Sequence, residues 1–185
     1  MTRRRWLIRG AALGLLGRAG VSAAQAPIDL ARHGLVLLMR HAQTEPGIGD
    51  PAGFMLGECS TQRNLSAAGR LQARRLGQWI RLRGWAPQRV RASAWCRCLD
   101  TAQLAFGSAE SWPALNSFFD SAGAEPAQTA ELRRALAAAT PGHIEAWVTH
   151  HVNVLALCGE SLAMGELLVM QGGSAAGVTL LRMSV

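Results

Sequence analysis

The sequence predicts a three-layer α/β/α fold, in which helices cover both faces of a mostly parallel central sheet. Apolar runs typical of strands alternate along the chain with segments of helical periodicity, and this order is characteristic of α/β domains. The run at residues 35–39 is apolar at every position, as expected of a strand that is buried on both faces. We therefore expect one domain with a single sheet.

The first half of the domain is predicted as follows. The strand at 35–39 ends at Arg40, and a loop rich in glycine, proline and aspartate extends from Thr44 to about Arg63. Ser66 is expected to cap a helix that continues to about Arg83. A short strand at 90–93 and a helix at 95–106 come next, and 108–127 is expected to be an irregular connection.

The second half begins with a predicted helix at 129–139. A strand at 144–149 then runs into His150, and His151 is expected to open the next helix. Strands at 166–170 and 178–182 are predicted to form a closing pair around the glycines at 172–173. In such sheets, ligands bind beyond the carboxyl ends of the strands. Two separate strands therefore bring a histidine, His41 or His150, to the same edge.

Residues 1–26 have the pattern of a secretory signal peptide, and residues 27–185 are the expected mature domain. Five arginines surround a short apolar stretch, and the segment ends in Ala24-Gln25-Ala26. The apolar stretch is too short to cross a bilayer, so no permanent membrane anchor is expected. The opening arginines also resemble a twin-arginine export motif, and both export routes stay open. The predicted location is the periplasm of a bacterium or the medium.

The charge of the chain gives little support to a nucleic-acid role. The net charge falls from +7 to +2 once residues 1–26, with five arginines and no acidic residue, are removed. No block of like charge remains in the rest of the chain. We therefore expect no nucleic acid as a partner.

Four cysteines can form disulfides in an exported chain, namely Cys59, Cys96, Cys98 and Cys158. Four cysteines allow three pairings, and the sequence does not choose between them. Cys96 and Cys98 are too close in sequence to pair well, so one of them is expected to pair with Cys59 or Cys158. A zinc site is disfavoured, because Cys-x-Cys lacks the usual ligand spacing.

Arg40-His41 has the composition of a phosphoryl-transfer site. Phosphoryl transfer needs a nucleophile and a cage of positive donors around the phosphoryl oxygens. The planar fork of arginine N–H groups suits that cage. An imidazole can be the nucleophile, because it forms a covalent intermediate that water later cleaves.

Four motifs in order resemble the histidine phosphatase superfamily, whose fold is phosphoglycerate mutase-like. Arg40-His41-Ala42 resembles its Arg-His-Gly/Ala signature, and residues 64–73 resemble its Leu-Thr/Ser-x-x-Gly-x-x-Gln-Ala helix start. Residues 93–102 resemble its Ser-x-x-x-Arg-x-x-x-Thr-Ala element, and residues 148–150 resemble its second histidine motif. The resemblance covers the chain from residue 36 to about 155.

This resemblance implies roles for individual residues. His41 would be the phosphorylated nucleophile, and Arg40 and Arg97 would bind the phosphoryl oxygens. His150, favoured over His151, would be a further donor in the pocket. The remaining candidate substrate contacts are Gln43, Thr44 and Arg63. The partner implied is a small phosphorylated substrate or phosphate, and no cofactor and no metal are implied.

The chain departs from the family at the acid that protonates the leaving oxygen. Ser117 stands where the family usually has a glutamate or aspartate, and Asp120 is the nearest carboxyl group. Without an acid, slower hydrolysis or an easier leaving group, such as that of phosphohistidine, would be expected. Asp120 is therefore only a candidate acid.

The sequence as a whole predicts an exported phosphatase that hydrolyses phosphate monoesters through a phosphohistidine on His41. Two alternatives keep the same fold: a phosphate-binding module without catalysis, and a phosphohistidine phosphatase. A third alternative is a thiol-redox or metal protein built on Cys96-x-Cys98. Phosphorylated envelope sugars are one possible substrate, by analogy alone.

Overall fold

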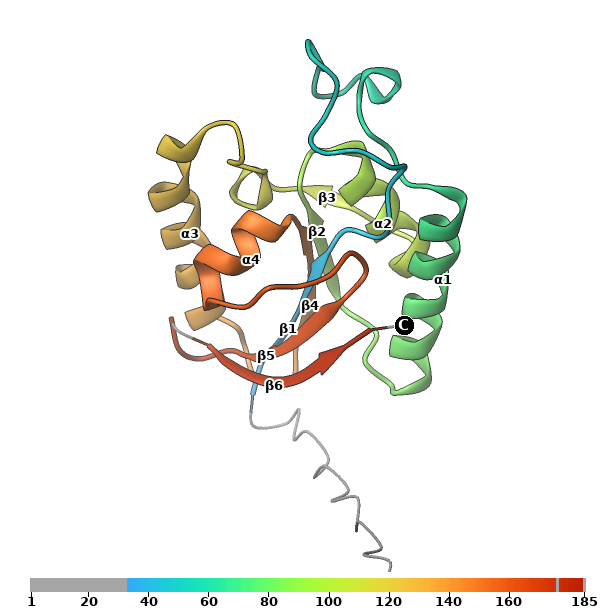
Figure 1. The fold of residues 1–185 in the computed structure, drawn as a ribbon. Coiled ribbons are helices and arrows are strands. Elements are labelled where there is room, and N and C mark those ends of the chain that lie inside the picture. The colour runs from blue at the N-terminus through green and yellow to red at the C-terminus, as the bar shows by residue number, and fades with distance from the viewer. Residues whose placement is uncertain (1–32, 176, 185) are drawn as a thin grey trace, which may run out of the picture.

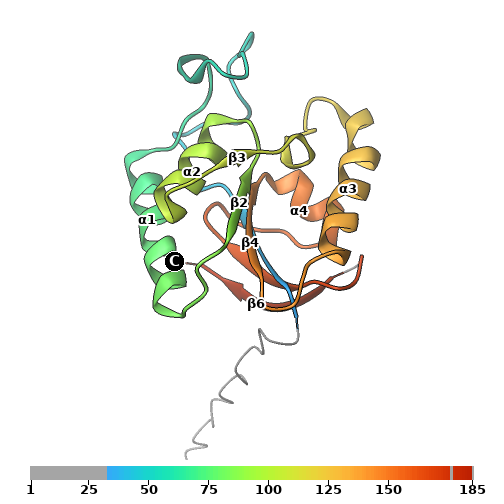
Figure 2. The ribbon, with the colours of Figure 1, turned by 180° about the vertical axis from the view of Figure 1, so that it is seen from behind.

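The computed structural model describes residues 33–175 and 177–184. The predicted signal peptide, residues 1–26, lies outside the described residues. The described chain forms one six-stranded sheet between two pairs of helices (Figures 1 and 2). This is the three-layer arrangement that the sequence predicts.

The sheet is parallel over four neighbouring strands and antiparallel at one end. Its order is β3-β2-β4-β1-β5-β6. β3, β2, β4 and β1 pair in parallel, whereas β5 runs antiparallel to β1 and β6 antiparallel to β5. The strands are β1 (Leu35–Arg40), β2 (Arg89–Ala92), β3 (Glu110–Ser111), β4 (Ile144–Thr149), β5 (Leu167–Gln171) and β6 (Val178–Met183).

Each face of the sheet carries one pair of helices and one apolar core. α1 (Ala67–Leu82) and α2 (Cys96–Phe106) cover one face, and α3 (Glu125–Ala137) and α4 (His151–Cys158) cover the other (Figures 1 and 2). Alternate residues of β1 enter the two cores: Leu37 packs on the side of α1, and Leu38 on the side of α3 and α4. The unbroken apolar run of β1 follows from this burial on both sides.

Two glycines of α1 allow close packing, one against the chain after the first histidine motif and one against α2. The hydroxyl of Ser66 caps the helix, since its Oγ accepts from the Gly69 N–H at 3.0 Å. A Cβ added at Gly69 would lie 1.8 Å from the carbonyl oxygen of Gln43, and one at Gly77 would lie 2.0 Å from that of Ala105. The glycine of the 64–73 motif therefore has a packing role.

The connection predicted as irregular over 108–127 contains more structure than expected. It holds the short strand β3 and two 3-10 turns, Pro113–Leu115 and Ala122–Ala124. The prediction for the next helix was wrong at its start, because α3 begins at Glu125 and not at residue 129. Proline is compatible with the first turn of a helix, so Pro126 lies inside α3.

The closing strand pair is confirmed, with its turn after Gln171 at the predicted glycines. Within the described residues, no helix has the length and apolar character needed to cross a membrane.

Candidate active site

A pocket of about 350 Å³ opens at the carboxyl edge of β1 and β4. Four of the residues that line it form what we call the basic floor: Arg40, His41, Arg63 and His150. Arg40 ends β1 and His41 follows it, and His150 follows β4, which pairs with β1 in parallel. The sheet register thus brings the two predicted histidines together, with ring centroids 5.5 Å apart.

His41 is buried and held in one tautomer. Its Nδ1 lies 2.9 Å from the Ala42 carbonyl oxygen, which can only accept a hydrogen bond. Nδ1 therefore carries the proton and Nε2 keeps its lone pair. Burial and the charges of the neighbouring arginines together lower the pKa of His41 to about 3, although the hydrogen bond to Ala42 opposes them. A neutral imidazole with a free Nε2 is suited to nucleophilic attack.

The backbone around His41 is fixed by neighbouring elements. Its N–H donates to the Thr149 carbonyl of β4 at 2.9 Å. The next N–H, of Ala42, donates to the hydroxyl of Thr101 in α2 at 3.0 Å. Thr101 is the threonine of the 93–102 motif, so that motif holds the nucleophile loop in place.

His150 is oriented by a serine of the same motif. Its Nε2 lies 2.8 Å from the Ser93 hydroxyl, and its ring packs edge-on against Trp95. Ser93 also contacts the side-chain oxygen of Asn116 at 3.3 Å. Because Nε2 is engaged, Nδ1 is the nitrogen left for a ligand. Burial, followed by the charges of His41 and the arginines, keeps the pKa of His150 well below its usual value.

Several donors around the pocket have no hydrogen-bond acceptor among the described residues. They are the buried Nε groups of Arg40, Arg63 and Arg97, together with Nδ1 of His151. Buried arginine donors without an acceptor are costly. An anion such as phosphate would supply acceptors for those that face the pocket.

Arg97 was expected to bind phosphate directly, but it does not line the pocket. Its two terminal nitrogens donate to the two carboxylate oxygens of Asp50, at 2.7 and 3.1 Å. Both side chains are 6% exposed. The pair is electrically neutral overall, so the positive potential of the pocket comes mainly from Arg40 and Arg63. We infer that Asp50 holds the Arg97 side chain in place outside the pocket.

Asp50 is held by two further donors in the loop and in the chain before α2. The Arg63 N–H donates to it at 2.9 Å, and the Trp95 indole N–H at 3.0 Å. Burial raises the pKa of the Asp50 carboxyl, but the hydrogen bonds from Arg97, Arg63 and Trp95 outweigh this and lower it. Asp50 is therefore an ionised ligand of Arg97 and a poor proton donor.

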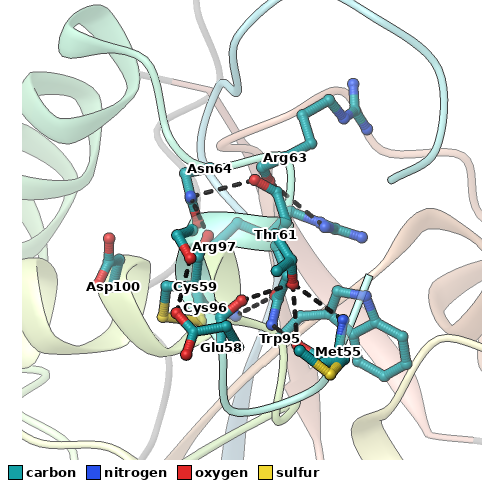
Figure 3. The surroundings of a disulfide bond; sticks show 12 residues. Met55, Glu58, Cys59, Thr61, Arg63, Asn64, Trp95, Cys96, Arg97 and Asp100 are labelled. Carbon is teal, nitrogen blue, oxygen red and sulfur yellow. Dashed lines mark hydrogen bonds between the residues drawn. A yellow bond between two sulfur atoms is a disulfide. The ribbon is translucent and has the colours of Figure 1, made fainter. Parts of the chain in front are cut away.

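A disulfide joins the loop that carries Asp50 to the start of α2 (Figure 3). Cys59 pairs with Cys96, which is one of the pairings left open by the sequence. Next to it, the side-chain oxygen of Gln62 accepts from the Cys96 N–H at 3.0 Å. Figure 3 shows Arg63 and Arg97 beside this junction, so one cross-link anchors the surroundings of both arginines.

The hypothesis of a redox or metal centre at Cys96-x-Cys98 fails on this geometry. Cys96 is bonded to Cys59, so the two nearby thiols are not available as a pair. Burial raises the pKa of Cys98 to about 12, which leaves almost no thiolate. The described residues contain no group of three or more side chains able to hold a metal ion.

Besides Arg97, three further residues expected in the site lie outside the pocket. Gln43 is exposed, and its backbone binds Gln72 and Ser66. Thr44 is buried, and its hydroxyl contacts the Met164 sulfur at 3.6 Å. Asp120 is exposed and does not line the pocket, so the structure does not place it as the acid. Ser117, at the place of the family's acid, does line the pocket.

The sequence reasoning missed Asp50, and it assigned His151 only to the start of a helix. His151 does open α4, and it also lines the pocket. Asp50 lies in a loop with no regular pattern, 47 residues before Arg97. Its only sequence signal was a carboxyl group in a loop that follows the nucleophile, which is too common a feature to single out.

The buried histidine makes a testable contribution to stability. His41 titrates at about 3 in the folded protein, against 6.5 in the unfolded chain. Between these values the unfolded state binds more protons, so stability falls as the pH falls. We expect His41 alone to lower the free energy of unfolding by roughly 2 kcal/mol from pH 7 to pH 5. Urea titrations at both pH values should show a smaller difference in His41→Ala.

Comparison with known families gives one clear match. The model of the histidine phosphatase superfamily (branch 1) matches residues 36–164, which is more than half of the chain. The match includes every residue of the basic floor. None of the curated protein sequences matches the chain significantly.

Solved structures share the fold at low sequence identity. The protein histidine phosphatase SixA, complexed with tungstate, has a TM-score of 0.59 and 20% identity over 81% of this chain and 96% of that chain. A phosphoserine phosphatase mutant from Entamoeba histolytica, in complex with phosphoserine, has a TM-score of 0.58 and 17% identity over 80% and 95%. A mycobacterial glucosyl-3-phosphoglycerate phosphatase has a TM-score of 0.54 and 17% identity over 74% and 92%. At these identities the likeness shows the fold.

Proposed function

This chain belongs to the histidine phosphatase superfamily, and from that premise we propose that it hydrolyses phosphate monoesters through a phosphohistidine on His41. The observation that carries the proposal is the state of His41. It is neutral, it donates from Nδ1 to a carbonyl, and it lines the same pocket as Arg40 and Arg63 with its Nε2 unprotonated.

In the first step, the Nε2 lone pair of His41 attacks phosphorus. A P–N bond forms, the ester P–O bond breaks, and the leaving oxygen takes the electron pair and then a proton. In the second step, water attacks the phosphorus, and the P–N bond breaks. The electron pair returns to Nε2, and inorganic phosphate leaves with the hydroxyl group of the water. The other proton of the water passes to solvent and balances the proton taken up by the leaving oxygen.

The basic floor supplies the charge that both steps require. Arg40 and Arg63 line the same pocket as the nucleophile and are cations, and their donors stabilise the phosphoryl oxygens in the transition state. The ring of His150 is held in the floor by the contact between its Nε2 and the Ser93 hydroxyl at 2.8 Å. Ser93 is therefore a positioning residue.

A phosphohistidine phosphatase is the second candidate. It is favoured by one observation: no aspartate or glutamate lies among the described residues that line the pocket. A leaving group that needs little protonation is compatible with such a site. The neighbour SixA is a protein histidine phosphatase, which supports this candidate by analogy alone.

Export to the periplasm or the medium remains part of the proposal. The support is the signal pattern of residues 1–26 and the Cys59–Cys96 bond. Structural disulfides persist in oxidising compartments and are rare in reducing ones.

Trapping of the covalent intermediate tests the proposed function. Residues 27–185 are mixed with p-nitrophenyl phosphate and quenched during turnover, and the intact mass is measured. We expect one added phosphoryl group, stable in base and lost in acid, that maps to the peptide containing His41. Turnover without any phosphorylated enzyme would contradict the covalent mechanism.

A further inference from the structure

The pocket has an apolar rim around its basic floor. We give this name to four of its lining residues: Ile48, Phe119, Val152 and Met164. Ile48 is 94% exposed and Phe119 is 63% exposed, so both leave apolar surface uncovered at the pocket. Ile48 lies in the loop after the nucleophile, and Phe119 lies in the connection before α3, so these two residues are far apart in sequence.

The apolar rim and the basic floor together indicate which kind of substrate fits the pocket. A phosphoryl group fills only part of a 350 Å³ pocket, so the rest of the substrate lies against the rim. Outside the basic floor, the only polar side chains among the described lining residues are those of Ser117 and His151. Sugar hydroxyl groups would find few partners there, and desolvating them without partners is unfavourable. An apolar leaving group gains free energy from the same surface.

The lack of a carboxylic acid in the pocket further limits the kinds of leaving group that can depart. Ser117 lines the pocket at the family's acid position, and a hydroxyl is a poor proton donor. Asp50 is held ionised by Arg97, and Asp120 does not line the pocket. An aliphatic alkoxide leaves slowly without a proton donor. A phenolate leaves more easily, because a phenol such as that of tyrosine has a pKa of about 10.

We propose that the preferred substrates are aryl phosphate monoesters, whose aromatic leaving group packs on Ile48 and Phe119. The inference rests on the proposed function and adds the class of substrate to it. The rim stabilises the ring by apolar contact, and Phe119 can also stack on it. Attack by His41 releases the phenolate, which then takes its proton from water.

Rates on matched esters test this proposal. We would compare phenyl phosphate with n-hexyl phosphate, which has the same number of carbon atoms, and with 2-naphthyl phosphate. We expect kcat/KM for phenyl phosphate to exceed that for hexyl phosphate by about 10-fold or more. We expect 2-naphthyl phosphate to gain a further several-fold, because its larger ring covers more of the rim.

Variants of the rim separate binding of the ring from leaving-group chemistry. Ile48→Ser and Phe119→Ser should each lower the ratio of kcat/KM for 2-naphthyl phosphate to that for acetyl phosphate by about 5-fold. Leu82→Ser is the matched control, since Leu82 is 79% exposed at the end of α1 and does not line the pocket. It should leave that ratio unchanged.

The outcomes distinguish the two levels of the proposal. Turnover of hexyl and phenyl phosphate at equal kcat/KM, or a ratio unaffected by both rim variants, would overturn the aryl preference and leave the phosphatase standing. No turnover of any ester, with no phosphorylated enzyme, would overturn the phosphatase and the aryl preference together.

Discussion

Replacing His41 by alanine should abolish phosphatase activity, with a fall in kcat of at least about a thousandfold. The substitution removes Nε2, the atom that forms the P–N bond, and no other described residue has the same place at the end of β1. The assay is hydrolysis of p-nitrophenyl phosphate by residues 27–185 from pH 4 to pH 8. Residual activity within about 10-fold of the wild type would show that His41 is not the nucleophile.

A binding measurement keeps this result separate from misfolding. The arginines of the basic floor remain in His41→Ala, so inorganic phosphate should still raise its melting temperature. Loss of turnover with retained phosphate binding is the expected combination. Loss of both would point to a disturbed pocket in the variant. The role of His41 would then be decided by the intact mass and peptide map of the phosphorylated wild-type protein. A wild type that binds phosphate and turns over no ester would instead favour the binding module.

Asp50→Asn should be the most damaging change outside the pocket. It leaves Arg97 buried with a neutral partner, and breaking a buried ion pair costs about 3 kcal/mol or more. The Arg97 side chain and the Arg63 backbone N–H both lose a charged acceptor, so Arg63 in the basic floor loses its alignment. We expect kcat/KM to fall by roughly 100-fold. Urea denaturation and steady-state kinetics measure the two effects.

Asp100→Asn is the matched control for this variant. Asp100 lies on α2, like Arg97, and forms an ion pair with Arg70 of α1 at 3.0 Å. The side chain of Asp100 is 37% exposed and that of Arg70 is 44% exposed. Exposed pairs contribute little, so the loss should be below about 1 kcal/mol, with activity retained. If Asp50 were instead a competitor of phosphate for Arg97, Asp50→Asn would tighten phosphate binding. Tighter binding would therefore contradict a supporting role for Asp50.

Much of the fold followed from local patterns in the sequence. The apolar run of β1 and the polar residues at the ends of β1 and β4 lie in consecutive positions. Burial and strand length can therefore be predicted from them without knowledge of the fold. They predicted the strands, the edge at which ligands bind and the meeting of His41 with His150. The start of α3 was missed, because a proline was taken as part of the loop when it belongs to a first helical turn.

The sequence by itself therefore determined the family, the order of the elements and the residues of the nucleophile motif. Only the tertiary structure decided the partners of these residues. Asp50 meets Arg97, Cys59 meets Cys96, and Ile48 and Phe119 reach one pocket across long separations. Loops carry no periodicity that fixes their course, so such contacts depend on the packing of the whole chain.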